Sequence, residues 1–432
     1  MKNKYLKILS AFFAFAIVLS FCSCGRDQSV CPNKMESGST NQLHNESEEK
    51  ISDINFLGKR DDVITTSQGV YFLGPDTPNV ICYYDEQSET SVPLCSRPEC
   101  AHNDESCTAY MDGMLYLLLD DQNTSQPLYL YRTLESVEEN QNSKIEIYSM
   151  DVNGANRTLR MEYQSGLMDL PMAASREFLY FVSSEIDQST QNSVECLYQV
   201  NLSNGKLEKL QEYDCPTTLL GAYDQKLILE HNNDSLRQVV ADIFEYDVIT
   251  RKEKELFHYE AEPWIEGELN GKSHPVAFPY QNELYIFEPS EERKANLSCW
   301  DLRTGEKNIL AENVPYYGDQ IAEDAKFADG KLILRCVENK PDGSGIDSQT
   351  FAINLESGDW QEINLKDQYG LGLEVIGATD NHYVVALGES LHTSDVVKKD
   401  GTKETISYYA TDFYLVDKED YYKSIDEKIP LE

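Results

Sequence analysis

Short apolar runs alternate with polar turns along this chain, and one arrangement of the two recurs seven times. In each copy an apolar run ends in Asp or Asn, and a short polar turn follows. The residues that end these runs are Asp85, Asp151, Asn201, Asp247, Asp301, Asn354 and Asp417. The steps between them are 66, 50, 46, 54, 53 and 63 residues, which is typical of one supersecondary unit repeated with loops of varying length.

A second apolar run precedes each of these motifs and is bounded by turn-forming residues. The seven runs are rich in branched and aromatic residues and lie at 69–74, 113–119, 177–183, 225–231, 282–288, 330–336 and 381–387. Their length and composition are those of β-strands rather than helices. Each unit can therefore be divided into four antiparallel strands, A to D, in which this run is strand B and the Asp or Asn ends strand C.

We therefore predict an all-β chain that forms a β-propeller of seven four-stranded blades. Six or eight blades are the alternatives if a terminal unit is miscounted. The first and last units both look complete, so the ring requires no blade built from both ends of the chain.

The order of strands assigns each connection to one face of the propeller. The A–B and C–D connections share one face, which we call the turn face, and here nearly all of them are tight. The B–C and D–A connections share the opposite, loop face; the long ones are 120–143, 337–348, 388–407 and 257–274. Because long loops in compact domains are commonly functional, we predict that the loop face is the working face.

Residues 1–23 are predicted to be an export signal. Three lysines precede the apolar stretch 8–21, which is short for a membrane span. The stretch ends in Cys22-Ser23-Cys24-Gly25, which resembles the lipobox of bacterial lipoproteins, where a small residue precedes the cysteine that is lipidated. Cys24 follows Ser23 and is the expected lipidation site, whereas Cys22 follows the bulky Phe21 and is the alternative. An ordinary secretory signal is the competing interpretation.

Composition extends this interpretation to the rest of the chain. Residues 24–52 are expected to be the lipidated Cys and a disordered polar tether, and residues 53–432 the propeller. The protein is therefore expected outside the cell, anchored to the outer face of the cytoplasmic membrane by its lipid alone. With 37 Lys+Arg against 75 Asp+Glu, the net charge of −38 repels nucleic acid and excludes it as a partner.

The densest chemical signal lies between the first and second units. Cys95, Cys100, His102 and Cys107 follow the pattern C-x4-C-x-H-x4-C, and three thiols with one imidazole are the ligand set of a structural zinc site. A disulfide between two of the thiols, or thiols without any connection, are the alternatives for an exported protein. The cluster lies on a D–A connection, which predicts a position on the loop face. Calcium is not favoured, because no D-x-[DN]-x-[DN]-G loop occurs.

The same residues carry a resemblance to a known group of proteins. Cys95, Pro98, Cys100, His102 and Cys107 fit the form C-x-x-P-x-C-x-H-x4-C. This form resembles a Cys-rich stretch of uncharacterised β-propeller lipoproteins from Gram-positive anaerobic bacteria, and the repeats look like those of TolB-type or WD40-like propellers. The resemblance implies a propeller fold and a lipid anchor, and it implies no activity.

The sequence contains no G-x-S-x-G, H-E-x-x-H or P-loop motif, so no catalytic residues are assigned. Aromatic residues near acids on the D–A connections favour a sugar or a cationic ligand, with blade-to-blade packing as the alternative. These candidates are Tyr163, Tyr213, His258, Tyr259, Trp264, Tyr316, Tyr317, Asp319 and Tyr369. The leading hypothesis is a non-enzymatic surface protein that binds an extracellular protein, peptide or glycan. An extracellular polysaccharide lyase or glycosidase, and a scaffold of a membrane-associated complex, are the alternatives.

Overall fold

The computed structural model divides the chain into two units, Met1–Glu49 and Lys50–Glu432, and all described residues belong to the second. The described residues are 54–57, 63–74, 77–111, 114–118, 127–134, 144–163, 167–186, 193–232, 240–260, 275–291, 293–316, 325–340, 345–397, 403–425 and 427–431. Within these ranges, no helix has both the length and the apolar character needed to cross a bilayer.

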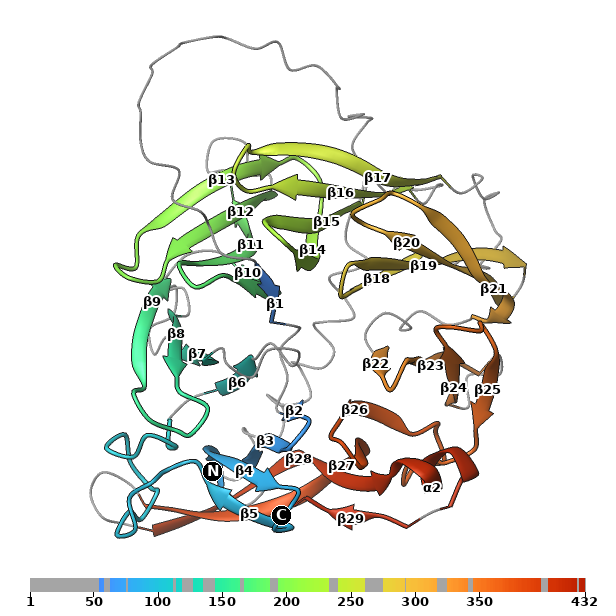
Figure 1. Cartoon of the computed structure of the whole chain (residues 1–432). Helices are drawn as coiled ribbons and strands as arrows, with labels where there is room; N and C mark the ends of the chain where they lie inside the picture. Colours follow the sequence, from blue (N-terminus) through green and yellow to red (C-terminus); the bar gives the residue numbers. More distant parts are fainter. Residues whose placement is uncertain are drawn as a thin grey trace, which may run out of the picture. The chain divides into compact units, whose positions relative to one another are not determined.

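Seven antiparallel four-stranded sheets follow one another as the blades of a β-propeller, which confirms the predicted fold (Figure 1). Blade 1 contains β2 (Val63–Thr66), β3 (Gly69–Gly74), β4 (Thr77–Asp85) and β5 (Thr90–Pro93). Blade 2 contains β6 (Met114–Leu118), β7 (Leu128–Leu134), β8 (Lys144–Met150) and β9 (Thr158–Tyr163). Blade 3 contains β10 (Leu167–Ala174), β11 (Phe178–Ile186), β12 (Ser193–Asn201) and β13 (Leu207–Tyr213), with β1 (Asn55–Phe56) added to its inner edge.

The remaining blades repeat this order. Blade 4 contains β14 (Thr217–Tyr223), β15 (Lys226–Asn232), β16 (Val240–Asp247) and β17 (Lys252–Glu260). Blade 5 contains β18 (Val276–Tyr280), β19 (Glu283–Glu291), β20 (Lys294–Asp301) and β21 (Lys307–Pro315). Blade 6 contains β22 (Lys326–Ala328), β23 (Lys331–Asn339), β24 (Ile346–Asn354) and β25 (Trp360–Ile363). Blade 7 contains β26 (Glu374–Ala378), β27 (His382–Val397), β28 (Lys403–Asp417) and β29 (Ile429–Pro430), with α2 (Lys418–Lys423) before its last strand.

The Asp or Asn that ends each C strand has a local structural role. The carboxylate of Asp247 accepts hydrogen bonds from the backbone N–H groups of Ile249 and Thr250, at 3.0 and 2.7 Å. Asp85, Asn201, Asp301 and Asn354 each accept at least one such bond from the turn that follows, and Asp417 accepts two from the first turn of α2. Short polar side chains favour these turns because they satisfy turn amides that no strand can reach.

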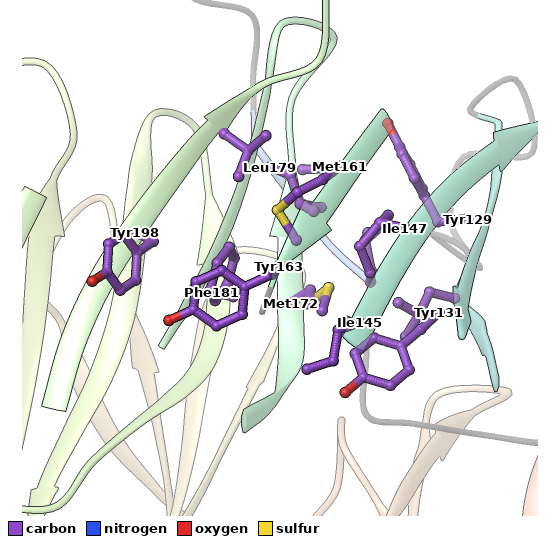
Figure 2. Close-up of a cluster of buried hydrophobic side chains, with 14 of the residues drawn as sticks. Tyr129, Tyr131, Ile145, Ile147, Met161, Tyr163, Met172, Leu179, Phe181 and Tyr198 are labelled. Carbon is purple, nitrogen blue, oxygen red and sulfur yellow. The ribbon is translucent and has the colours of Figure 1, made fainter. Parts of the chain in front are cut away.

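Buried side chains hold neighbouring blades together. Figure 2 shows one such cluster, in which Ile145, Ile147 and Met161 of blade 2 pack against Met172 and Phe181 of blade 3. Branched and aromatic residues fill these seams because alternate residues of each strand project from opposite faces of the blade. The core is therefore a series of seams between blades.

The two ends of the ring meet without a shared strand, because blades 1 and 7 each take all four strands from one end of the chain. The chain enters from the turn face: Ile54 N–H donates to the carbonyl of Asp224, in the A–B turn of blade 4, at 2.6 Å. It then runs antiparallel to β10, and Leu57 N–H donates to the carbonyl of Met172 at 2.9 Å. Ile54, the first described residue, is thus attached at the turn face.

Three predicted B–C connections were wrong: in blade 2 because the run 113–119 is strand A and not strand B, and in blades 6 and 7 because backbone pairing continues beyond the apolar runs. The run 113–119 contains the inner strand β6, and the predicted loop 120–143 contains strand β7. In blade 6 the strands extend until only 340–345 connects them. In blade 7 most of 388–407 is strand, because β27 and β28 stay paired from Glu389↔Thr411 to Val397↔Lys403. We call this projecting hairpin, residues 389–411, the arm.

Candidate metal centre and loop face

The cysteine motif interrupts the outer strand of blade 1. Leu94 N–H donates to the carbonyl of Ile81 in β4 at 2.8 Å, and Ile81 N–H donates to the carbonyl of Ala109 at 2.9 Å. Because Leu94 and Ala109 share one partner residue, residues 95–108 form an insertion within the edge of the sheet, which we call the cysteine loop. Pairing then resumes with the bridge between Val80 and Tyr110.

This geometry corrects the predicted position of the cluster. The cysteine loop lies between β5 and β6 in chain order, as a D–A connection does. However, its two ends are hydrogen-bonded to the middle of β4, so it projects from the outer edge of blade 1, where Figure 1 shows it, and not from the loop face. The sequence could not reveal this, because the strand resumes only after the insertion.

Local turns bring the four predicted ligands together. Cys100 N–H donates to the carbonyl of Arg97 at 3.2 Å, and Cys107 N–H donates to the carbonyl of Asp104 at 2.9 Å. The Asp104 carboxylate also accepts from the N–H of Ser106 at 2.8 Å. Each of these turns ends at or just before a cysteine, so each directs a thiol toward the centre of the loop.

The donor atoms of Cys95, Cys100, His102 and Cys107 all lie within 4.8 Å of one another. His102 Nδ1 lies 3.3 Å from Cys107 Sγ. Tetrahedral zinc, with Zn–S bonds of about 2.3 Å, requires sulfur atoms about 3.8 Å apart, so small movements would close this set around an ion. Cys107 is buried, the other three are partly buried, and all three cysteines are free thiols. The cluster could therefore bind a metal such as zinc.

The guanidinium of Arg97 contacts the cysteine loop and favours the ionised form of the Cys95 thiol. Its Nη2 donates to Cys100 Sγ at 3.2 Å and to the carbonyl of Ser106 at 2.6 Å. Burial of the Cys95 thiol acts to raise its pKa, but hydrogen bonds from the backbone and side chain of Arg97 outweigh this and lower the pKa to about 6. Burial raises the pKa of the Cys107 thiol to about 11. A metal ion would favour the ionised form of each thiol that it binds.

Residues of blade 2 hold the cysteine loop, and sequence analysis missed them. Glu105 lies between two predicted ligands, and its carboxylate forms ion pairs with Arg132 at 2.6 Å and with Arg157 at 3.2 Å. Arg132 comes from β7 and also pairs with the buried Glu146 of β8 at 2.5 Å. No local pattern marks these arginines, because they lie far from the cysteines in sequence.

Several candidate aromatic residues lie in the seams between blades. Tyr163, labelled in Figure 2, is buried and hydrogen-bonded to Ser183 of blade 3 at 3.1 Å. Tyr213 is buried, with its ring 4.7 Å from that of His231 in blade 4. Tyr316 is also buried and stacks on Phe287 at 5.5 Å. These three side chains take part in core packing.

Other candidates reach the surface at the loop face. His258 is half-exposed, and its Nδ1 lies 2.5 Å from Asp242, whose hydrogen bond raises the pKa of the imidazole. Tyr259 is partly buried, and its burial raises the pKa of the phenol. Tyr369 is 64 % exposed and donates from its hydroxyl to the carbonyl of Glu389 at 3.0 Å, at the base of the arm. Trp264, Tyr317, Asp319 and both candidate lipidation sites, Cys22 and Cys24, lie outside the described residues.

The arm is the main feature of the loop face that the sequence did not predict. Leu391 and Tyr409 are directly opposite each other in its two strands, and they are 60 % and 66 % exposed. On the other side of the hairpin, His392 Nε2 lies 3.0 Å from the Asp412 carboxylate. One side of the arm therefore presents a cross-strand apolar pair to solvent.

Comparisons with known proteins give distant likenesses only. No protein-family model and no curated protein sequence matches the chain. Among solved structures, it is similar to the β-propeller domain of the Trilobed protease from Pyrococcus furiosus, with 11% identity, a TM-score of 0.39 and coverage of 62% of this chain and 71% of that chain. It is also similar to TolB from Acinetobacter baumannii, with 12% identity, a TM-score of 0.34 and coverage of 72% of this chain and 65% of that chain. A third similar structure is an oligogalacturonate lyase from Vibrio parahaemolyticus, with 10% identity, a TM-score of 0.44 and coverage of 87% of this chain and 96% of that chain. None of the activities of these proteins is carried over to this chain.

Proposed function

We propose that this chain is a lipid-anchored β-propeller on the cell surface that binds an extracellular protein, peptide or glycan through its loop face. The observation that carries the proposal is the arm, which holds Leu391 and Tyr409 opposite each other and exposed on a paired hairpin. Paired apolar side chains that stand out from a polar surface are typical of binding sites. Tyr369 contacts the base of the arm, because its hydroxyl donates to the carbonyl of Glu389.

The path of the chain at its described N-terminal end supports this arrangement. Ile54, the first described residue, is hydrogen-bonded to Asp224 at the turn face. The arm projects from the opposite, loop face, because it extends the B–C connection of blade 7. The first described residue and the arm therefore lie at opposite faces of the propeller.

We also propose that the Cys95, Cys100, His102 and Cys107 cluster holds one structural zinc ion. The four protein ligands would fill a tetrahedral coordination sphere and leave no open position for a substrate. The zinc ion would serve to fix the conformation of the cysteine loop. Elemental analysis of anaerobically purified protein should find about one zinc per chain. A Cys95–Cys100 or Cys100–Cys107 disulfide in that protein would refute the site.

The binding proposal is tested on intact cells with a photo-crosslinking amino acid placed at Leu391 or Tyr409. A matched control carries it at Ile309, which is 59 % exposed on the outer strand β21. We expect a discrete covalent adduct from the arm positions and none from the control. Equal labelling at all three positions would refute binding through the arm, and turnover of a polysaccharide by the purified propeller would favour the lyase or glycosidase alternative.

The anchor is tested separately by replacing Cys24 with Ser. We expect the variant to appear in the culture medium, whereas the unaltered protein stays in the membrane fraction and carries a lipid on Cys24 by mass spectrometry. Lipid on Cys22 would correct the site, and unaltered protein released into the medium would refute the anchor.

A further inference from the structure

Arg157 is the residue of blade 2 that makes most contact with the cysteine loop. It lies in the turn between β8 and β9, and its Nη1 donates to the carbonyl oxygens of Thr108, at 3.1 Å, and Tyr110. Its Nη2 donates to the carbonyl and to the carboxylate of Glu105, both at 3.2 Å. The side chain of Arg157 is only 12% exposed. One guanidinium thus holds the half of the loop that contains Cys107.

The turn that carries Arg157 is also fitted to blade 1 itself. The hydroxyl of Tyr71, in β3, donates to the carbonyl of Val152 at 2.9 Å. Gly154 has φ +82°, and a Cβ there would lie 2.2 Å from the carbonyl oxygen of Leu94, the residue just before the cysteine loop. The turn therefore contacts both ends of the insertion.

The cysteine loop has little regular secondary structure to fix its conformation. No described residue between Cys95 and Thr108 is in a helix or strand. Ordering such a segment costs about 1–2 kcal/mol of backbone entropy per residue, and metal ligation is one of the few interactions inside the loop that can offset it. The carbonyl groups that Arg157 binds lie beside the ligand Cys107. Metal binding and the contacts of Arg157 should therefore favour the same loop conformation.

We propose that Arg157 is a positioning residue for the metal centre and that it couples metal binding to the packing of blade 1 on blade 2. The inference rests on the proposed zinc site. Coupling of this kind is reciprocal, so removal of Arg157 must weaken metal binding, and removal of the metal must loosen the turn at 151–157. The position of this seam explains why the coupling matters: the ring contains no shared strand, so its integrity depends on side-chain contacts between blades.

The first test measures zinc affinity by competition with a chromophoric chelator, on the reduced full-length propeller. Arg157→Gln should weaken binding about tenfold, within the range seen when residues outside the ligand set are changed. Arg157→Lys, which keeps the charge but loses the forked geometry, should lie between Arg157→Gln and the unaltered protein. Arg251→Gln is the matched control, because Arg251 lies in the corresponding turn of blade 4 and pairs with Glu208 of blade 3 at 2.5 Å, outside the cysteine loop. It should bind zinc with unchanged affinity.

The second test needs no variant and remains decisive if Arg157→Gln fails to fold. Zinc removal should increase hydrogen exchange in residues 151–158 and 79–82, and should leave the corresponding turn of blade 4, residues 248–251, unchanged. A folded Arg157→Gln protein with normal zinc affinity, or unchanged exchange at 151–158 after zinc removal, would overturn the coupling while the metal site stands. An unaltered protein that binds no zinc would overturn both.

Discussion

Glu86 closes the ring between blades 1 and 7, and its replacement gives the sharpest prediction for stability. It lies in the C–D turn of blade 1, and its Oε1 accepts three hydrogen bonds from the A–B turn of blade 7. The donors are Thr379 Oγ1 at 2.5 Å, Asn381 N at 3.2 Å and His382 Nδ1 at 2.8 Å. The Glu86 side chain is only 7% exposed, so water cannot easily replace these bonds.

The magnitude follows from the three donors that would lose their acceptor. Each hydrogen bond to a charged group contributes about 1.5–3 kcal/mol, and the losses are not additive, so Glu86→Ala should lower the free energy of unfolding by about 3 kcal/mol. With a urea dependence of about 3 kcal/mol/M, the unfolding midpoint should fall by about 1 M. Glu86→Gln should cause a smaller loss, because the amide oxygen can still accept.

The effect should depend on pH. Burial of Glu86 acts to raise the pKa of its carboxyl, but the bonds from Thr379, His382 and Asn381 outweigh this and hold the pKa below its ordinary value of 4.5. A depressed pKa stabilises the folded state above the unfolded-state pKa, and this contribution is lost as the pH falls through the folded value. The difference between the unaltered protein and Glu86→Gln should thus be full above about pH 5 and shrink on further acidification.

Urea titrations at several pH values, followed by tryptophan fluorescence, provide the assay. Glu89→Gln is the control, because Glu89 lies in the same turn and is exposed. If Glu86→Gln and Glu89→Gln unfold at the same urea concentration at pH 7, the ring is not held by this carboxylate. A difference that does not shrink at all as the pH falls below 4.5 would refute the electrostatic part of the reasoning.

Three further predictions concern the repeat, the seam and the loop face. Asn354→Ala should lower the free energy of unfolding by about 1 kcal/mol in urea titrations, whereas Asn354→Asp, which still accepts from the turn amides, should not. Gly377→Val should lower the melting temperature, because a Cβ at that position would lie 2.2 Å from Thr65 Oγ1 across the seam; an unchanged melting temperature would contradict this packing. The raised pKa of His258 should return toward 6.5 in Asp242→Asn by NMR titration; the stabilisation from this pair is full below pH 6.5 and is lost as the pH rises through the folded-state pKa.

The parts of the fold that could be predicted depend on interactions between near neighbours in sequence. In six of the seven blades the Asp or Asn of the motif accepts hydrogen bonds from amides two or three residues later, so the motif can be recognised without knowledge of the ring. The metal ligands came together for the same reason, because all four lie within the short segment Cys95–Cys107.

The parts that could not be predicted depend on partners far away in the chain. The arm was expected as a loop because its sequence is mostly polar. In the structure, residues Glu389 to Val397 of β27 nevertheless pair with β28 along the whole arm. In the sequence, Tyr163, Tyr213 and Tyr369 look alike, because each is an aromatic residue near acids on a D–A connection. Only the neighbouring blade decides that the first two are buried and the third is exposed.

The sequence alone therefore determined the repeating unit, the number of blades and the identity of the four candidate ligands. Tertiary structure decided where the cysteine loop stands, because strand pairing with Ile81 returns the chain to the edge of blade 1 after the insertion. It also decided that Arg157, about fifty residues from the nearest ligand, holds that loop. Local hydrogen bonds can be read from neighbouring residues, whereas contacts between blades exist only after the ring has closed.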